Sequence, residues 1–235
     1  MRNLLKKLFF GDKELHHPPG HKHVDRRKQN LKAIWNNEHH DDYGLEKIIR
    51  LFLAGIQFIF PVGHIKHLVE KKNPRYKDLV VDICIVLKLI FPVVALLNDW
   101  QYIPFIYWFM VWVAAETVFY IPAMIFASDT HMRPRSYRRS MLLLFLNYME
   151  LILVFGVLYS AGDHFNKAFV HWFDGIYFSI STATALGPGD YIPSTLTAKI
   201  LISIQQILFL WFVVISLNFF TSNIERKGYF SNGRN

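Results

Sequence analysis

Four long apolar stretches, almost free of Lys and Arg, recur along the chain. They cover residues 79–97, 104–127, 141–161 and 196–221, which are 19, 24, 21 and 26 residues long. As helices rising about 1.5 Å per residue they would reach about 28 to 39 Å, against a bilayer hydrocarbon core of about 30 Å. The pattern therefore predicts four membrane-spanning helices, the longest of them tilted.

A fifth apolar stretch, residues 51–62, is shorter than the other four. It contains Gln57, and Pro61 stands near its end. A helix of this length does not span a bilayer comfortably. We expect this stretch to lie in the membrane interface.

The composition agrees with a membrane protein. Hydrophobic residues make up 52% of the chain and charged residues 19%, whereas globular domains average about 25% charged residues. A single-domain soluble enzyme is excluded. The chain has no Gly-x-Ser-x-Gly elbow, His-Glu-x-x-His or phosphate-loop motif, so we expect a protein that is not an enzyme and has no cofactor. With a single cysteine, Cys84, an intrachain disulfide and a Cys-based zinc site are also excluded.

The net charge of +8 lies outside the apolar stretches. Of the 26 Lys and Arg residues, 16 lie in residues 1–78, four in 128–140 and three in 222–235. The connection 98–103 has no basic residue, and 162–195 has only Lys167. Because short segments rich in Lys and Arg stay on the cytoplasmic side, we expect a cell-membrane protein with both termini in the cytoplasm.

Histidines gather in the polar N-terminal part of the chain, at His16, His17, His21, His23, His39 and His40. Such a tract could bind a metal ion or respond to pH near 6. No carboxylate or Cys completes a ligand set at regular spacing, which favours a solvated segment.

The connection between the last two apolar stretches differs from a simple loop. From Phe165 to Ile180, apolar residues recur at spacings of three and four and predict a short amphipathic helix over about 168–182. The Gly187-Pro188-Gly189 turn that follows cannot continue a helix. In a membrane, such backbone persists only where it is buried in protein or lines water, which a pore would provide.

The order of a span, a short helix beginning at Phe173-Asp174-Gly175, a filter-like turn ending in Gly189-Asp190-Tyr191 and a second span resembles the pore module of potassium channels. The resemblance covers about residues 140–222. In that family, four copies of a Thr-Val-Gly-Tyr-Gly stretch replace the hydration shell of the ion with backbone carbonyls. By position, the resemblance implies a homotetramer and a filter formed by Thr184, Ala185, Leu186, Gly187, Pro188, Gly189 and Asp190.

The filter departs from the family pattern at two positions. Ala185 lacks the threonine hydroxyl that supplies the innermost ring of ligands, and Pro188 replaces a tyrosine and removes an N–H. Tyr177 and Phe178 stand where many potassium channels have two tryptophans that brace the filter tyrosine. We expect a differently braced cation channel that passes K+ and Na+ with weak or altered potassium preference. The alternatives are a K+-selective channel and a pore-like membrane protein that does not conduct.

In this family the last span lines the inner cavity. One face of that span would be formed by Ser203, Gln206, Leu210, Val213 and Leu217. Gln205 and Gln206 each face either protein or water, and the sequence does not decide between them.

Ionisable residues inside the apolar stretches are costly in lipid and tend to pair. They are Asp82, Lys88, Glu116 and Glu150. We expect Lys88 to contact Glu116 or Glu150. At the outer mouth, Asp163, Asp174 and Asp190 stand against Lys167, a balance of −2 per chain, and Asp174 is expected near the start of the pore helix.

Together these features predict an all-α membrane protein with four transmembrane helices and a re-entrant pore helix and filter loop between the last two. Its parts would be a cytoplasmic and interfacial segment (1–78), a two-helix hairpin (79–139), the pore module (140–222) and a short cytoplasmic tail (223–235). The expected partners are further copies of the chain, membrane lipids and permeant monovalent cations, with no nucleic acid and no bound metal beyond the permeant ions.

Overall fold

The computed structural model describes residues 31–36, 44–56, 58, 60, 77–126, 137–187 and 189–224. The histidines of the N-terminal tract, Pro188 and the tail beyond Ile224 lie outside these residues. Contacts divide the chain into two units, Met1–Leu87 with Glu116–Arg133 and Lys88–Ala115 with Pro134–Asn235. Each unit is described by itself.

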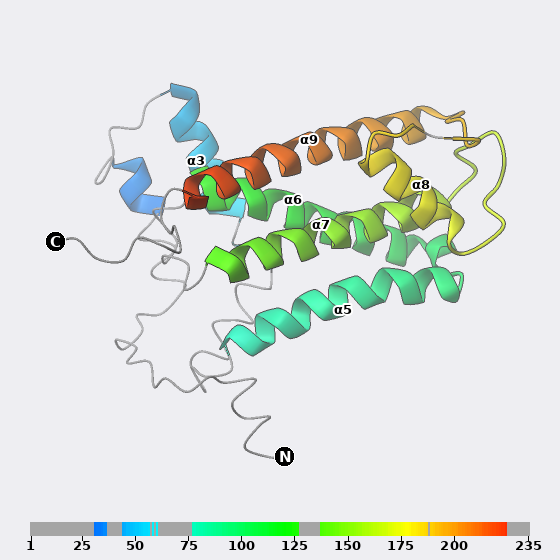
Figure 1. Ribbon diagram of the computed structural model, residues 1–235, viewed down its shortest axis with the longest axis horizontal. Coiled ribbons are helices and arrows are strands. Elements are labelled where there is room, and N and C mark those ends of the chain that lie inside the picture. The colour runs from blue at the N-terminus through cyan, green and yellow to red at the C-terminus, as the bar shows by residue number, and fades with distance from the viewer. Residues whose placement is uncertain are drawn as a thin grey trace, which may run out of the picture. The chain divides into compact units, whose positions relative to one another are not determined.

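The elements named in the described residues are all helices, as the sequence predicts (Figure 1). In chain order they are α3 (Gly44–Ile56), α5 (Lys77–Leu97), the 3-10 turn η2 (Trp100–Tyr102), α6 (Pro104–Phe126), α7 (Tyr137–Ser160), α8 (Asp174–Ala183) and α9 (Leu196–Ile224).

Three of these helices contain a segment long and apolar enough to cross a membrane. The segments are Leu79–Leu97, Arg139–Ser160 and Leu196–Leu217. Within the described part of α6, the corresponding apolar segment is the shorter Pro104–Phe119. Three of the four predicted spans thus have the required length and composition, and the fourth stays a prediction.

In the second unit, the contacts of α5 with α6 and α7 include an aromatic contact and an ion pair. The rings of Phe91 in α5 and Phe109 in α6 meet edge to face, with centroids 5.4 Å apart. Lys88 Nζ lies 3.4 Å from Glu150 Oε1 in α7, and the Glu150 side chain is 1% exposed. One of the two predicted partners of Lys88 is therefore confirmed.

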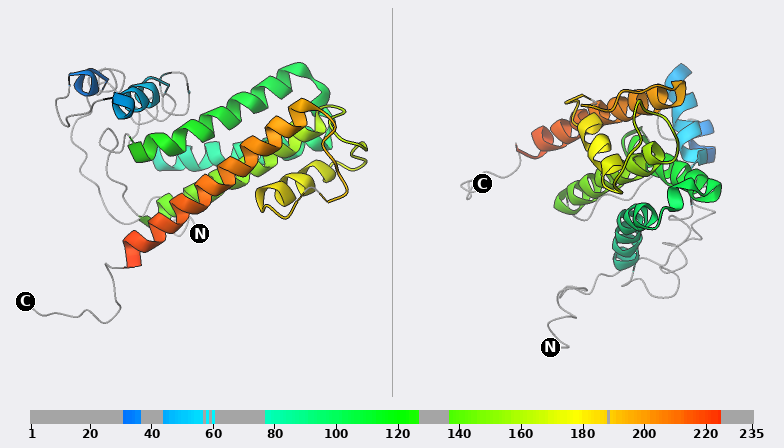
Figure 2. Two further views of the ribbon diagram at one scale, coloured as in Figure 1. Left: turned by 90° about the horizontal axis from the view of Figure 1, so that it is seen from above. Right: turned by 90° about the vertical axis from the view of Figure 1, so that its right-hand side faces the viewer.

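Helices α7, α8 and α9 form the core of the second unit, with α8 beside α7 at the end where α7 finishes and α9 begins (Figures 1 and 2). Two glycines allow the close approach of α8 to α7. A Cβ atom on Gly175 would collide with Ser160 Oγ and lie 2.6 Å from the carbonyl oxygen of Gly156. A Cβ atom on Gly156 would lie 3.2 Å from Ile176 Cα. Neither helix has room for a larger residue at these two points.

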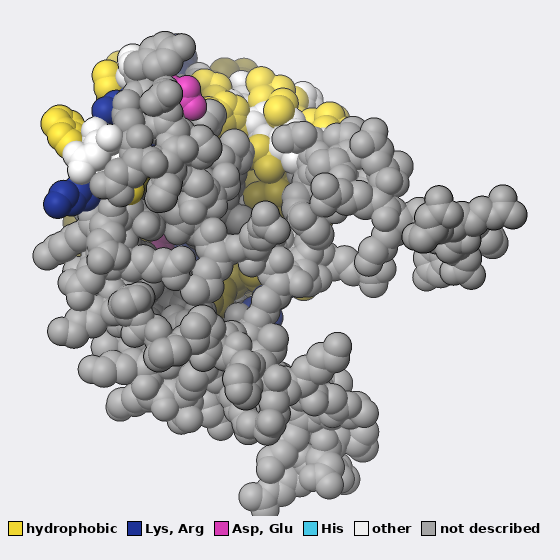
Figure 3. All heavy atoms as spheres, turned by 90° about the vertical axis from the view of Figure 1, so that its left-hand side faces the viewer, with side chains coloured by type: hydrophobic (Ala, Val, Ile, Leu, Met, Phe, Trp, Pro, Cys, Tyr) yellow, Lys and Arg dark blue, Asp and Glu magenta, His cyan; other side chains and the backbone are white. Residues whose placement is uncertain are grey.

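Many large apolar side chains remain exposed on the described helices. On the side of the molecule drawn in Figure 3, hydrophobic side chains predominate among those described. On α9, Ile200, Ile207 and Leu210 are each at least half exposed. Apolar surface of this extent is expected where lipid or other subunits cover a protein.

Candidate functional site

The short helix α8 starts at Asp174, so the start near residue 168 predicted from the apolar spacing is wrong, whereas the start at Phe173-Asp174-Gly175 implied by the resemblance agrees with the structure. Asp174 Oδ2 accepts the backbone N–H groups of Val170 and His171, at 2.8 and 2.9 Å. These bonds hold the residues before the helix in a turn, because a carboxylate can compete with the helical bonding of nearby amides. The expectation that Asp174 lies at the start of the pore helix is confirmed.

The same bonds set the ionisation of Asp174. Partial burial by itself would raise the pKa of this carboxyl, but the backbone hydrogen bonds from His171 and Val170 hold the pKa below its usual value. For Tyr191, burial first and the charge of Asp174 second raise the pKa of the phenol. Asp174 is thus a charged group in the first turn of α8, where the helix dipole favours an anion.

The C-terminus of α8 ends in a turn that forces Ala185 into a left-handed conformation. Ala185 N–H donates to Thr182 O and Leu186 N–H donates to Ser181 O, both at 3.1 Å. This pair of bonds is the Schellman arrangement, in which glycine is the usual left-handed residue. Here the residue is alanine, with φ 56°, at a cost of about 1 kcal/mol.

Positive φ then recurs at alternate positions through the predicted filter. After Ala185 it is found at Gly187, with φ 99°, and at Gly189, with φ 58°. A Cβ atom added to either glycine would meet nothing within 4 Å. Glycine is therefore required at both positions for backbone conformation and not for space.

The predicted filter residues lie on the surface of the single chain. Thr184, Ala185, Leu186, Gly189 and Asp190 are exposed, and Gly187 is half-buried. The Thr184 hydroxyl donates back to the carbonyl oxygens of Ile180 and Ser181, at 2.9 and 3.3 Å. The structure thus brings the described filter residues together in one exposed turn.

Five aromatic residues pack around α8 and form what we call the aromatic cluster: Tyr159, Phe165, Phe169, Phe178 and Tyr191. The fully buried ring of Phe178 is at its centre. Its centroid lies 4.6 Å from that of Phe165, 4.9 Å from Tyr159 and 6.2 Å from both Phe169 and Tyr191. Rings at these separations and tilted orientations stabilise one another beyond their burial.

The aromatic cluster revises the expected bracing. Of the two pore-helix residues predicted to replace the tryptophan pair, Phe178 is buried in the cluster, whereas Tyr177 is 54% exposed. Tyr191, which follows the filter, packs at 4.7 Å from Phe169. The role of Tyr191 could not be predicted, because its partners Phe178, Phe169 and Phe165 lie 13 or more residues away along the chain.

A buried hydrogen-bond network joins α7, α8 and α9. Gln205 Nε2 donates to the carbonyl oxygen and to Oγ of Ser179, at 3.0 and 2.8 Å. The Tyr159 hydroxyl donates to Gln205 Oε1 at 2.7 Å, and Ser179 Oγ donates to Ile152 O at 2.6 Å. Such networks rigidify a core when every group has a partner.

This network shows that Gln205 and Gln206 have different environments. Gln205 is 3% exposed and faces protein within the chain, whereas Gln206 is exposed. The predicted cavity face is otherwise uncovered in the single chain: Ser203, Leu210 and Leu217 are exposed and Val213 is half-buried. That these residues line a cavity stays a prediction.

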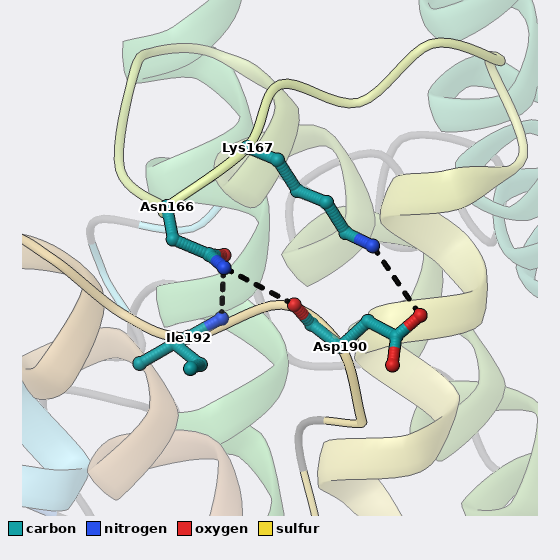
Figure 4. A network of polar contacts seen from close by, with 4 residues as sticks. All are labelled: Asn166, Lys167, Asp190 and Ile192. Carbon is teal, nitrogen blue, oxygen red and sulfur yellow. Dashed lines mark hydrogen bonds and ion pairs between the residues drawn. The ribbon is translucent and has the colours of Figure 1, made fainter.

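The two flanks of α8 and its turn are paired with each other (Figure 4). Asn166 N–H donates to Ile192 O at 3.0 Å, and Ile192 N–H donates to Asn166 Oδ1 at 2.8 Å. Asn166 Nδ2 also donates to the carbonyl oxygen of Asp190 at 3.4 Å, and Phe165 and Pro193 form an antiparallel bridge. The chain therefore leaves the end of α7 and returns beside its point of departure before α9 begins.

Lys167 contributes a charge to the same place. Its Nζ lies 3.3 Å from Asp190 Oδ2 and 4.8 Å from the centroid of the Tyr191 ring. Both side chains of the ion pair are well exposed, Asp190 at 87%, and exposed pairs contribute little stability. From the sequence, Lys167 was considered only as part of the charge balance of the outer mouth, and Asn166 was not identified. No local sequence pattern indicates contacts between residues so far apart along the chain.

No group of three or more His, Cys, Asp or Glu side chains in the described ranges is arranged to hold a metal ion. The polar atoms of the exposed turn are backbone carbonyls, amides and hydroxyls, together with the Asp190 carboxylate. Of these groups, the carbonyl, hydroxyl and carboxylate oxygens suit the weak, rapidly exchanging coordination of a monovalent cation.

The comparisons with known proteins point to the same segment. A family model described as ion channel matches residues 145–226. No curated protein and no solved structure gives a significant match to the chain. The matched residues hold most of α7, all of α8 and the exposed turn, and α9. This match supports the potassium-channel-like pore module that the sequence predicts for this part of the chain.

Proposed function

We propose that the ion channel domain of residues 145–226 conducts monovalent cations through a filter completed by four copies of the chain. One observation carries this proposal: a turn with positive φ at Ala185, Gly187 and Gly189 is exposed at the end of α8. The aromatic cluster and the Gln205 network hold α8 in place, and the Tyr148 hydroxyl donates to the carbonyl oxygen of Ala183 at the end of that helix. A turn braced on one side and exposed on the other suits a filter subunit.

The proposed preference for cations over anions follows from the direction of α8. The C-terminus of a helix carries a partial negative charge, and α8 ends at Ala183, immediately before the predicted filter. Four such helix ends around one axis would favour a cation over an anion. The acidic residues of the flanks, Asp163 and Asp190, add to this preference.

The proposal of a homotetramer follows from the turn and the face of α9 that are exposed in a single chain. A single turn supplies one quarter of a ring of carbonyls, and closed rotational symmetry supplies the rest. The exposed face of α9 with Gln206 and Leu210 would then line the inner cavity. In this arrangement four helices cross the membrane, α8 and its turn re-enter from one side, and both termini are cytoplasmic.

Selectivity is proposed to be weak. Ala185 offers no hydroxyl to the ion, and the Thr184 hydroxyl is already bonded to carbonyl oxygens of α8. Backbone carbonyls would then be the only ligands at the inner end of the filter. Strong potassium selection remains the alternative if these carbonyls suffice.

The test is cation flux into liposomes that contain the purified protein, measured in potassium and then in sodium. We expect flux of both ions and a tetramer by light scattering in detergent. The protein with Gly187→Val is the matched negative control. Absence of flux in either ion from a folded tetramer would overturn the channel proposal and favour a pore-like protein that does not conduct.

A further inference from the structure

Helix α3 is too short to cross a membrane. It contains 13 residues, which at 1.5 Å per residue gives about 20 Å, against a hydrocarbon core of about 30 Å. The helix also begins before the apolar stretch 51–62, at Gly44. Its first two turns mix polar with apolar residues and so lie outside the continuous apolar stretch.

One face of α3 is apolar and exposed. We call it the α3 stripe: Leu45, Ile48, Ile49 and Phe52. These residues recur at spacings of three and four, which places them on one side of a helix, and they are 72%, 64%, 37% and 55% exposed. The buried residues of the helix are Arg50, Leu53 and Ala54. The stripe therefore lies on a different side of α3 from these buried residues, although Phe52 at its end contacts Phe119 of α6.

The position of α3 beside α6 indicates what covers the stripe. In the first unit, the ring centroids of Phe52 and Phe119 are 5.7 Å apart, in an edge-to-face contact. Phe119 ends the apolar segment Pro104–Phe119 and lies seven residues before the end of α6, which is about 10 Å along the helix. The α3 stripe thus lies near the end of a helix that is proposed to cross the membrane.

Charge and aromatic chemistry around α3 agree with a lipid surface. Lys47 Nζ lies 5.9 Å from the centroid of the Trp35 ring, and Trp35 is 67% exposed. Tryptophan and lysine are enriched where proteins meet the membrane–water interface. Residues 1–78 hold 16 Lys and Arg against nine Asp and Glu, a net charge of +7, which is complementary to anionic lipid headgroups.

We propose that α3 lies in the plane of the membrane on an anionic lipid surface, with the α3 stripe inserted at the boundary of headgroups and acyl chains. Helices of this kind bury their apolar face about 5–10 Å deep. In-plane anchoring of α3 would hold the basic N-terminal part of the chain against the bilayer. This inference concerns the first unit and does not require that the pore conducts.

The test uses the full chain with Cys84→Ser, so that a single new cysteine can carry a spin label. Labels at Leu45→Cys, Ile48→Cys and Phe52→Cys report on the stripe, and Glu46→Cys, an exposed position off the stripe, is the matched control. In vesicles of phosphatidylcholine and phosphatidylserine, collisions with oxygen and with a water-soluble nickel complex are compared. We expect the oxygen-to-nickel ratio to be severalfold higher at the three stripe positions than at Glu46→Cys.

Two outcomes would overturn the proposal. Equal, high nickel access at all four positions would mean that the stripe faces water. Low access of both oxygen and nickel at the stripe would mean that protein, such as a second copy of the chain, covers it. Vesicles of phosphatidylcholine alone test the anionic component: we expect a lower ratio at the stripe there, and an unchanged ratio would contradict the role of anionic lipid. The labels report without ion flux, so failure here is distinct from failure of the channel proposal.

Discussion

The two sides of α8 differ in how completely one chain forms them. Behind the helix, Tyr159 and Phe178 of the aromatic cluster and the Gln205 network are buried, and the polar groups of the network are bonded within the chain. In front, the turn from Thr184 to Asp190 is exposed and includes a left-handed alanine. A single chain therefore fixes the support of the turn but leaves its open side to other copies. Substitutions behind α8 should act on stability, and substitutions in front should act on conduction.

The largest expected effect is on conduction, from Gly187→Val or Gly189→Val. A β-branched residue is strongly disfavoured at positive φ, although open space surrounds both glycines. We expect flux to fall to the level of empty liposomes while the tetramer persists in detergent. Gly55→Val, at a glycine that also has open space but ordinary φ, should conduct normally. Normal conduction in both filter variants would exclude this turn as the filter.

A loss of stability is expected from Gly175→Ala, behind α8. The added Cβ would meet Ser160 Oγ and the Gly156 carbonyl oxygen, and overpacking of this kind costs about 1–3 kcal/mol. The midpoint of thermal unfolding in detergent should fall. Gly162→Ala is the matched control, because its Cβ would approach only the ring of His164, which can move. Equal midpoints for the two variants would contradict the close packing of α7 and α8.

Gln205 and Gln206 are neighbours on α9, but Gln205 is buried whereas Gln206 is exposed. Substitutions at the two positions should therefore separate effects on stability from effects on conduction. Gln205→Leu leaves the Tyr159 hydroxyl without its acceptor and should destabilise the protein by about 1–3 kcal/mol. Gln206→Leu, on the exposed face, should leave the unfolding midpoint nearly unchanged and alter conductance instead. Thermal unfolding and flux are measured on both variants. A greater loss of stability in Gln206→Leu than in Gln205→Leu would contradict the burial of Gln205.

Smaller effects are expected at Ala185, where a substitution can change both the backbone conformation and the ion selectivity. Ala185→Gly removes the left-handed strain and should stabilise the protein by about 1 kcal/mol. Ala185→Thr combined with Pro188→Tyr restores the family residues and should raise potassium preference, measured as reversal potentials with K+ and Na+ on opposite sides. Because threonine is disfavoured at φ 56°, the gain requires the backbone of residue 185 to change. A wild type that already selects potassium strongly would show that carbonyls suffice.

The smallest effect concerns charge at the outer flank. Asp190→Asn should lower inward cation current at about 10 mM salt, and the difference should shrink near 1 M, where the screening length is about 3 Å. Since Lys167 lies 3.3 Å from Asp190, Lys167→Gln should do the opposite and raise the current at low salt. Currents that do not depend on either substitution would remove this ion pair from the path of the ion.

Features that depend on local sequence could be predicted. Apolar stretches define the long helices, because burial in lipid or protein requires continuous apolar residues. The partner of Lys88 was narrowed to two carboxylates, since a lone charge among apolar helices is costly, and Glu150 is one of them. The glycines of the turn were identified because only glycine tolerates such backbone freely.

Features that depend on side-chain contacts between distant residues could not be predicted. The start of α8 was placed too early, because the apolar spacing of residues 168–173 continues a helical pattern that the Asp174 carboxylate interrupts. Gln205 and Gln206 have the same side chain, so the sequence alone cannot distinguish them. The hydrogen bonds with Tyr159 and Ser179 show that Gln205 is the buried one. The contacts of Asn166 with Ile192 likewise leave no local pattern.

The ion pair between Lys88 and Glu150 bears on how the protein is made. Helix α5 precedes α7 along the chain, so in the proposed membrane arrangement Lys88 would reach the bilayer before its partner Glu150. Insertion of a lysine at the centre of a helix costs about 2.5–3.5 kcal/mol, and α5 would be held at the insertion machinery until α7 arrives. The same dependence means that residues 140–222 are not a transferable cassette: grafted alone into another protein, they would carry Glu150 into the bilayer without its lysine.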